Sequence, residues 1–519
     1  MLYPLALLPI LLVLALMIGR RWGAHQAGPA GWLAGVLVAA LGFGLTSQVF
    51  WVSQAKGLLL SLFVLAVMWP ALFLYHWSDQ NGGITALARL LERAIPNRGM
   101  CLLLLAWAVS GLLEGLAGFG LPIAVVAPML TALGVAPLTA VAAVAVGHAW
   151  AVTFGDMGVI FQTLIAVVGL DAAATVPWAA LLLGLACWLC GLLAAAILGE
   201  LRQWPKISVL AGVIAATQYG LAAGGLLPLA AFGAGLAGIL VYLLGAKLAA
   251  MVYRLAGRAG SPREAVLAAG ETSSPTQPAV VTMLTYGVLT LLMAALTMVA
   301  PLRAWAQRTA WKANFPAVQS RTGFSTPAGS GQVFKPLAHP GTLILLVASA
   351  SILFTGARAR GRATALAGKA ALATCHSAVA ATVGVISMVG LSTLMEHSGM
   401  SWLLAKGLSK TLGSLYPLLS PCVGILGAFA TGSNNNSNVL FGALQKNVAC
   451  LLGINPCLLA AAQTAGGSLG SMLAPVKIIL GCSTVGQVGK EGQVLRKTVP
   501  YGLAMGLALG LVAWFLSHW

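Results

Sequence analysis

The sequence predicts an all-α polytopic membrane protein of about 12 transmembrane helices plus two re-entrant hairpins, arranged as an inverted repeat. Three observations predict this fold. The chain is 59% hydrophobic and 7% charged, whereas a soluble domain carries roughly 25% charged residues. Apolar segments of about 20 residues, the length that crosses a bilayer, recur along it. A short motif also occurs twice, as LGVAP from Leu133 and as LGINP from Leu452.

Each copy of this motif stands between two polar, glycine-rich interruptions of an apolar stretch. EGLAGFGLP (114–122) precedes the first copy, and GHAWAVTFGDMG (147–158) follows it. ATGSNNNSN (430–438) precedes the second copy, and GGSLGSMLAPVK (466–477) follows it. A duplicated pair of interrupted hydrophobic segments is typical of secondary transporters, which bind substrate near the middle of the membrane.

Uninterrupted apolar segments give the predicted whole spans, because each approaches the length of a transmembrane helix. The first is expected to be retained, since Arg20 and Arg21 follow it and no basic residue precedes it, the reverse of a cleavable signal. The predicted spans are 2–19, 31–51, 57–77, 177–199, 207–227, 228–250, 279–300, 341–355, 370–395 and 498–517.

Two longer apolar stretches are interrupted, and each is expected to fold as a hairpin followed by a broken helix. In the first half (1–255) these are hairpin 100–133 and broken helix 138–170. In the second half (279–519) they are hairpin 416–452 and broken helix 457–489. A cytoplasmic linker, 256–278, is expected to join the halves.

The basic residues of the loops predict opposite orientations for the two repeats. Most clusters fall on one side only if the first hairpin enters and leaves from the cytoplasm and the second from outside. The 301–340 loop, with five Lys or Arg, is the exception, and long external loops escape the rule more readily. Segments 79–97 and 396–413 are amphipathic and basic, and are expected to lie flat at opposite interfaces.

The net charge of +18 does not indicate nucleic-acid binding, because the chain has no basic tract interleaved with aromatics. Its basic residues lie in short loops, where they set orientation and meet anionic lipid. We therefore expect membrane lipid and no nucleic acid among the partners. Cys187 and Cys190 form a CxxC pair, but no second pair or histidine cluster completes a metal site, so no metal or cofactor is predicted.

The four interruptions are predicted to converge on one hydrated binding site. Backbone that leaves a helix inside a membrane is tolerated only where protein or a wet cavity satisfies its N–H and C=O groups. Helix N-termini there suit a carboxylate, because they carry positive partial charge and free N–H groups. Gly118 and Gly120 would allow close approach of substrate. The alternative is that these glycines only let helices pack closely.

Glu114 is the leading proton-coupling candidate, because it is an acidic residue in an apolar stretch at the predicted tip of the first hairpin. A carboxylate there is costly unless it is paired, hydrated or protonated. The alternative is a structural carboxylate with satisfied hydrogen bonds. His148 is a candidate proton relay, against a purely structural histidine, and Asp156 is the third proton-coupling candidate.

The second hairpin tip carries neutral amides and hydroxyls that suit a hydroxyl-bearing organic anion. Lys477 is expected to hold the substrate carboxylate or to neutralise Asp156 or Glu114, and the alternative is that it snorkels to the interface. The predicted substrate-binding residues are Gly118, Gly120, Thr431, Ser433, Asn434, Asn436, Asn438, Gln463 and Lys477.

At these residues the chain resembles the lactate permease family of bacterial proton-coupled monocarboxylate symporters. The segments that carry the resemblance are 114–122, TGSNNNSNVLFGALQ at 431–445, AAAQTAGGSLGSM at 460–472 and VGKE at 488–491. The resemblance implies uptake of L-lactate, glycolate or a related 2-hydroxy acid with a proton across the bacterial cytoplasmic (inner) membrane. It also implies an elevator-type carrier, a class that often forms homodimers, although this is an analogy.

The chain departs from the family pattern at its charged positions. Asn434 stands where the family usually has Asp, and Ser471 where it has Lys. Asp156 and Lys477 stand where the family is typically uncharged. This pattern is consistent with relocated charges that perform the same chemistry, or with a different substrate.

Two alternatives within transport are a carrier for another organic anion, such as a dicarboxylate or sulfonate, and one driven by sodium. An enzyme is not predicted, because the sequence has no nucleophile–base pair or metal-ligand set such as HExxH on a membrane helix. A membrane sensor is disfavoured because no soluble signalling domain accompanies the spans.

Overall fold

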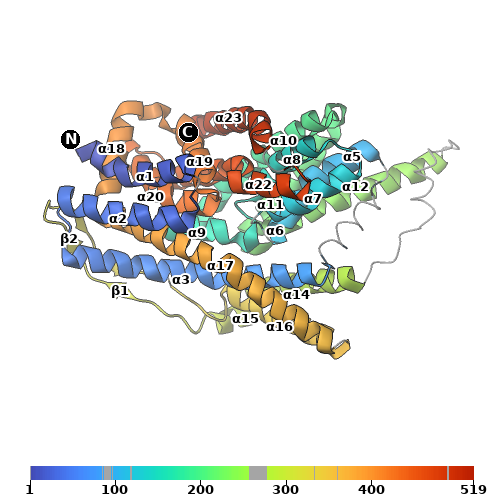
Figure 1. Cartoon of the computed structure of the whole chain (residues 1–519), viewed down its shortest axis with the longest axis horizontal. Helices are drawn as coiled ribbons and strands as arrows, with labels where there is room; N and C mark the ends of the chain where they lie inside the picture. The colour runs from blue at the N-terminus through green and yellow to red at the C-terminus, as the bar shows by residue number, and fades with distance from the viewer. Residues whose placement is uncertain are drawn as a thin grey trace.

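The computed structural model describes residues 2–20, 22–83, 86, 95, 97–116, 118, 120–255, 277–331, 333–358, 360–487 and 490–518. Over these residues the chain is almost entirely helical (Figure 1). Ten helical runs are long and apolar enough to cross a membrane, and four shorter apolar helical stretches lie at Leu2–Val13, Pro122–Ala132, Val280–Leu289 and Gly341–Thr355. The predicted all-α membrane fold is therefore confirmed. Most of the predicted linker, 256–276, and most of segment 79–97 lie outside the described residues.

The helices before the first hairpin are α1 (Leu2–Gly19), α2 (Ala24–Gly42) and α3 (Ser47–Gln80). Those between the two repeats are α10 (Ala172–Leu198), α11 (Trp204–Ala223), α12 (Ala230–Leu255), α14 (Gln277–Met298), α15 (Ala300–Ala306), α16 (Pro340–Arg358), α17 (Arg360–His397) and α18 (Met400–Leu412). Helix α23 (Glu491–Leu516) ends the described chain. Segment 396–413 does form a separate helix, α18.

The loop between α15 and α16 contains four strands of two residues each. They are β1 (Asn314–Phe315), β2 (Val318–Gln319), β3 (Ser325–Thr326) and β4 (Gly329–Ser330). Antiparallel pairs join β1 to β4 and β2 to β3. The loop packs back onto the start of α3, since the Arg321 N–H donates to the Gly44 carbonyl at 2.8 Å.

The predicted boundary between the second and third spans, 31–51 and 57–77, is wrong. Helix α2 ends at Gly42, and α3 already begins at Ser47. Gly44 has a φ of +63°, a left-handed conformation that glycine adopts without strain. Thr46 then caps α3, its hydroxyl accepting from the Val49 N–H at 3.2 Å. These two residues turn the chain about ten residues earlier than hydropathy indicates.

Residues 98–132 form the first hairpin. Its first arm is α5 (Arg98–Leu104), a π-helical turn (Leu105–Val109) and α6 (Ser110–Leu116), and its second arm is α7 (Leu121–Ala132). Arg98 at the start of the first arm donates to the Leu133 carbonyl, just beyond the second, at 2.9 Å. The chain therefore enters and leaves at the same end, as expected for a re-entrant hairpin.

The second hairpin consists of α19 (Tyr416–Thr431) and α20 (Asn434–Leu452). Ser420 of α19 and Gln445 of α20 close it with a hydrogen bond of 2.9 Å. Each hairpin is followed by a broken helix: α8 (Pro137–Gly147) and α9 (Val159–Val168) in the first repeat, and α21 (Pro456–Gly470) and α22 (Pro475–Thr484) in the second.

The two repeats pack reciprocally, as two-fold related units require. Helix α7 of the first hairpin contacts α22, and α20 of the second contacts α9. Likewise α10 contacts α21, and α23 contacts α8. Ser468 donates to the Ala149 carbonyl at 2.6 Å, and these two residues are 319 positions apart, the same separation as the two copies of the motif. Equivalent residues therefore meet between the two breaks.

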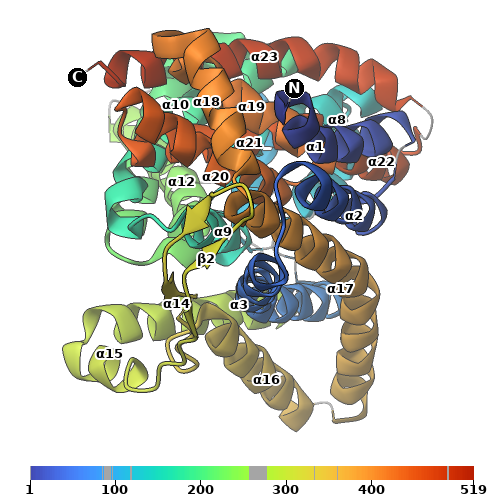
Figure 2. The same ribbon diagram turned by 90° about the vertical axis from the view of Figure 1, so that its left-hand side faces the viewer.

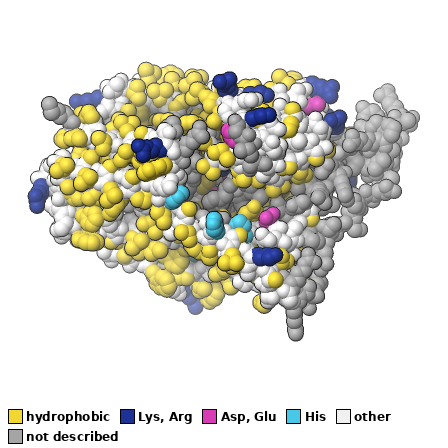
Figure 3. Space-filling model, viewed as in Figure 1, with side chains coloured by type: hydrophobic (Ala, Val, Ile, Leu, Met, Phe, Trp, Pro, Cys, Tyr) yellow, Lys and Arg dark blue, Asp and Glu magenta, His cyan; other side chains and the backbone are white. Residues whose placement is uncertain are grey.

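Around this double repeat lie the remaining helices. Helix α17 packs along α3 and α2, and α16 packs along α3 and α14; Figure 2 shows α14, α15 and α16 below the hairpins and broken helices. Hydrophobic side chains dominate the face in Figure 3. Leu41, Leu353 and Leu372 are 88%, 74% and 73% exposed, as expected where lipid replaces water.

Candidate substrate and proton site at the helix breaks

The first break is a strained turn that brings its polar residues toward the first hairpin. Helix α8 ends at Gly147, where a Cβ atom would overlap the Ala106 carbonyl of the hairpin. Further on, Asp156 and Met157 have φ angles of +48° and +56°, followed by Gly158 at +74°. Left-handed backbone costs about 1–3 kcal/mol per non-glycine residue and is typical of functional sites, where surrounding structure holds it.

A buried ion pair joins the two repeats. The Lys477 Nζ of α22 lies 3.3 Å from the Glu114 Oε1 of α6. Their side chains are only 9% and 1% exposed. No residue that the structure describes hydrogen-bonds to Glu114 Oε2. The sequence prediction placed both residues at helix breaks, but only the fold decides that they face each other.

Asp156 contacts the tip of the same hairpin. The Gly118 N–H donates a hydrogen bond to Asp156 Oδ1. A Cβ atom on Gly118 would lie 2.5 Å from that oxygen, so a side chain there would displace the Asp156 carboxylate from this position. Gly120 has a φ of +88°, and a Cβ atom there would lie 3.6 Å from Lys477 Cγ. Both predicted tip glycines therefore lie beside charged side chains.

His148 lies at the end of α8, fully buried. Its Nδ1 is 2.8 Å from the Val144 carbonyl. Because a carbonyl oxygen only accepts, Nδ1 is the donor, and Nε2 of the neutral ring is an acceptor. Within the described part of the chain, Nε2 has no hydrogen-bond partner. The charges of Glu114 and Lys477 both act on this imidazole, so His148 lies within electrostatic range of the ion pair.

The second hairpin tip contacts the other side of the first break. The Asn434 amide donates to Thr153 Oγ1 and to the Thr464 carbonyl, both at 3.1 Å. The Asn438 amide donates to Thr464 Oγ1 at 2.9 Å. Among the described residues, the Oδ1 atoms of both asparagines are buried without a hydrogen-bond donor, and that of Asn434 lies against Gly467. Two amide oxygens beside the break therefore have no donor in this part of the chain.

Glu114 and Asn434 flank one segment of chain. Thr153 binds Asn434, and two residues later Gly155 packs against Glu114, since a Cβ atom on Gly155 would lie 2.8 Å from the Glu114 carbonyl. The breaks thus come together as predicted from their duplicated spacing.

The other predicted residues of the second tip serve the turn itself. The Thr431 hydroxyl donates to the Gly427 and Ser433 carbonyls at 2.7 and 2.9 Å. Gly432, with a φ of +73°, reverses the chain beside Val476. Asn436 is buried in the first turn of α20. The tip of the second hairpin therefore lies next to α22, where Gly432 contacts Val476, the residue that precedes Lys477.

Gln463 already has protein partners at both ends of its amide. Its Nε2 donates to Ser437 Oγ at 3.0 Å, and its Oε1 accepts from Gln445 Nε2 at 3.0 Å. This chain of amides ties α20 to α21. Gln463 therefore holds the second hairpin against its broken helix and is less available to a ligand than Asn434.

Sequence reasoning missed three hydroxyl residues. All three are fully buried: Thr153, Thr464 and Ser468. They connect the two breaks, because Thr153 Oγ1 donates to the Thr464 carbonyl at 2.9 Å and the Thr153 N–H donates to Ser468 Oγ at 3.2 Å. Their position inside the interrupted segments was the available signal.

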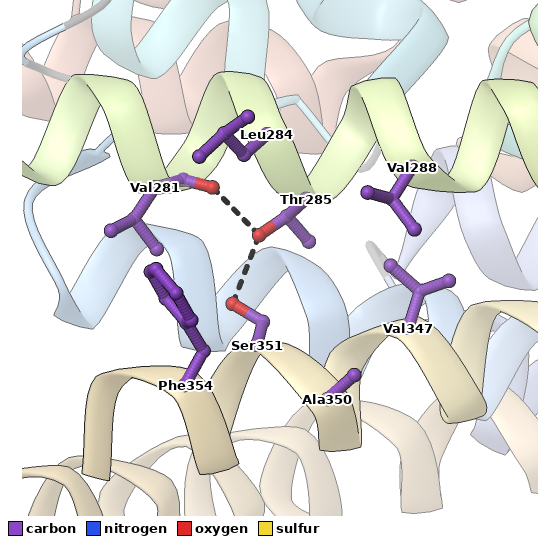
Figure 4. A pocket seen from close by; sticks show the side chains of 8 residues that line it. All are labelled: Val281, Leu284, Thr285, Val288, Val347, Ala350, Ser351 and Phe354. Atoms are coloured by element: carbon purple, nitrogen blue, oxygen red, sulfur yellow. Dashed lines mark hydrogen bonds between the residues drawn. The ribbon is translucent and has the colours of Figure 1, made fainter. Parts of the chain in front are cut away.

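Two grooves elsewhere do not suit an anion. One, of about 290 Å³, lies between α14 and α16 (Figure 4), where Thr285 and Ser351 hydrogen-bond each other at 2.9 Å among apolar side chains. The other, of about 540 Å³, lies between α3 and the 301–340 loop and is lined by apolar side chains and Lys312. The charges that would bind a carboxylate meet at the helix breaks instead.

Comparison with known proteins matches the chain over its whole length. A family model described as L-lactate permease matches residues 4–519. The glycolate permease GlcA of Escherichia coli is 27% identical, over 98% of this chain and 94% of its own. An L-lactate permease of Bacillus subtilis is also 27% identical, over 99% and 95%. The solved YdaH transporter of Alcanivorax borkumensis is 16% identical, with a TM-score of 0.45 over 87% of this chain and 84% of its own.

Proposed function

The chain belongs to the L-lactate permease family, and from this premise we propose that it carries a small monocarboxylate into the cell together with a proton. It is a multi-pass bacterial membrane transporter. The substrate class that we propose is L-lactate, glycolate or a related 2-hydroxy acid. The observation that carries the proposal is the buried Glu114–Lys477 ion pair, 3.3 Å long, between the two repeats.

This pair links proton binding to anion binding. Removing one charge from a buried ion pair costs about 3–5 kcal/mol, because the other charge is left uncompensated. When a proton neutralises Glu114, Lys477 lacks a counter-charge, and a substrate carboxylate supplies one. Each ligand therefore favours the other, and the net charge of the site is the same before and after both bind. That is the energetic requirement for symport.

Unpaired acceptors support a hydroxyl-bearing substrate. His148 Nε2 and Asn434 Oδ1 are buried without hydrogen-bond partners among the residues that the structure describes, and either would accept the O–H of a 2-hydroxy acid. A single nearby cation favours a monocarboxylate over a dicarboxylate, since Lys477 is the one described Lys or Arg that contacts the hairpin tips. A second carboxylate would be buried without a counter-charge.

We propose an elevator-type mechanism, in which both hairpins and both broken helices move as one unit against the surrounding helices. The support is the packing of the repeats, because hydrogen bonds between Thr153, Asn434 and Thr464 join the two breaks. A unit held together in this way would carry its site across the membrane intact.

The experiment is uptake into proteoliposomes with an imposed pH gradient, without sodium. We expect Glu114→Gln to exchange labelled lactate for unlabelled lactate but to lose accumulation driven by the gradient. Glu200→Gln is the matched control, because Glu200 pairs only with the exposed Arg202 at 3.3 Å. Gradient-driven accumulation by Glu114→Gln would overturn the proton assignment, and a strict need for sodium would overturn proton drive.

A further inference from the structure

The first hairpin tip already binds a carboxylate, and that carboxylate belongs to the protein. The Gly118 N–H donates to Asp156 Oδ1. A free N–H at a hairpin tip is the kind of donor that would hold a substrate carboxylate. In this structure the donor is occupied by a side chain of the same chemistry as the substrate.

The backbone around Asp156 is shaped to make this contact. Asp156 and Met157 both adopt left-handed φ angles, which direct the chain of the break back toward the hairpin. Gly118 lacks a side chain that would separate the two, since its Cβ would lie 2.5 Å from Oδ1. Left-handed backbone on one side and a close-fitting glycine on the other indicate that this contact is specific.

Lys477 is paired with Glu114 rather than with Asp156, so while that pair is intact a substrate carboxylate beside Asp156 would have no counter-charge of its own. Glu114 and Lys477 are the charged groups that act on Asp156, and His148 lies beside them. The other segments packed against it, α9 and residues 227–229, have no ionisable side chain. Helix α3 also contacts the turn 156–158, which contains Asp156. The charges that act on the Asp156 carboxylate do not include the ionisable residues of α3, which are Lys56, Tyr75, His76 and Asp79.

The Asp156 side chain has accessible surface into which it can move when a ligand displaces it from the Gly118 N–H. It is partly exposed, whereas Glu114 is 1% exposed. A displaced Asp156 carboxylate therefore keeps accessible surface, whereas Glu114 has almost none.

We propose that Asp156 is an internal substrate mimic, which occupies the Gly118 N–H in the empty carrier and which the substrate carboxylate must displace. The inference rests on the proposed function and gives Asp156 a role other than carrying the proton. Competition of this kind lowers apparent affinity and speeds release, because the side chain returns as the substrate leaves. It makes Asp156 an affinity-determining residue.

The test is the apparent affinity for L-lactate of Asp156→Asn and Asp156→Ala, measured by counterflow and by gradient-driven uptake. A neutral acceptor holds the N–H less strongly than a carboxylate, so we expect KM to fall about fivefold in Asp156→Asn and further in Asp156→Ala. Accumulation driven by the pH gradient should persist. A purely structural role would not tighten binding.

Asp171→Asn is the matched control. Asp171 caps α10, accepting from the Ala174 N–H at 2.8 Å, and asparagine caps equally well, so its KM should not change. An unchanged or higher KM in Asp156→Asn would overturn the inference, as would lost accumulation with counterflow intact, which would make Asp156 the proton carrier. Failure of the wild-type protein to accumulate any monocarboxylate would instead overturn the proposed function.

Discussion

Replacing Lys477 by methionine tests the central ion pair most directly. Methionine keeps much of the apolar volume of the lysine stem and removes the charge. At 3.3 Å, two unit charges attract by about 5 kcal/mol at an effective dielectric constant of about 20. Measured losses on breaking buried pairs are similar, about 3–5 kcal/mol. In Lys477→Met the Glu114 carboxyl must therefore take a proton permanently or destabilise the fold.

We expect Lys477→Met to lose lactate binding by about two to three orders of magnitude, because the substrate carboxylate has lost its cation. The double variant Lys477→Met/Glu114→Gln should recover much of the lost stability, since no uncompensated charge remains. Thermal unfolding of the purified proteins and lactate counterflow measure the two effects. Lys406→Met is the control, because Lys406 lies on α18, away from the breaks.

Two outcomes would refute the reasoning. One is wild-type KM and gradient-driven accumulation in Lys477→Met. The other is strictly additive destabilisation in the double variant, since residues that interact show a coupling energy and independent residues do not.

Three further predictions follow from the same contacts. His148→Leu should reduce the preference for lactate over propionate about fivefold, measured by competition, and an unchanged preference would show that Nε2 does not bind the hydroxyl. Thr153→Val, which removes the acceptor for Asn434, should destabilise the protein by about 1–3 kcal/mol in thermal unfolding; no change would contradict its linking role. Gly466→Ala should destabilise the protein by about 1–3 kcal/mol, because the new methyl would overlap the Pro421 backbone. Gly212→Ala is the control, because Gly212 has open space around it. Equal stability of the two variants in thermal unfolding would refute the close approach of Gly466 to Pro421.

The duplicated pattern in the sequence was sufficient to predict the hairpins and broken helices. Clusters of glycines and polar residues interrupt the hydrophobic runs where the chain leaves a helix at these breaks, so the breaks can be read locally. The turn between α2 and α3 was misplaced because a local signal, Gly44 followed by Thr46, lies inside a run that hydropathy alone reads as continuous.

The partners within the site could not be predicted in the same way. Sequence spacing offered Glu114 and Asp156 as alternative partners of Lys477, and the fold pairs Lys477 with Glu114 and Asp156 with Gly118. Gln463 looked like a ligand residue but is held by Ser437 and Gln445. Residues more than 300 positions apart meet only when the repeats pack.

The amino-acid order by itself determined that this chain is a membrane protein of two similar halves, and where each half leaves its helices, because hydrophobicity and helix interruption are properties of neighbouring residues. Tertiary structure alone decided which buried charges compensate one another and which side-chain amides already have hydrogen-bond partners within the protein. Those choices depend on distances of a few ångströms between the halves, over which a buried charge is either stabilised or forced to take a proton.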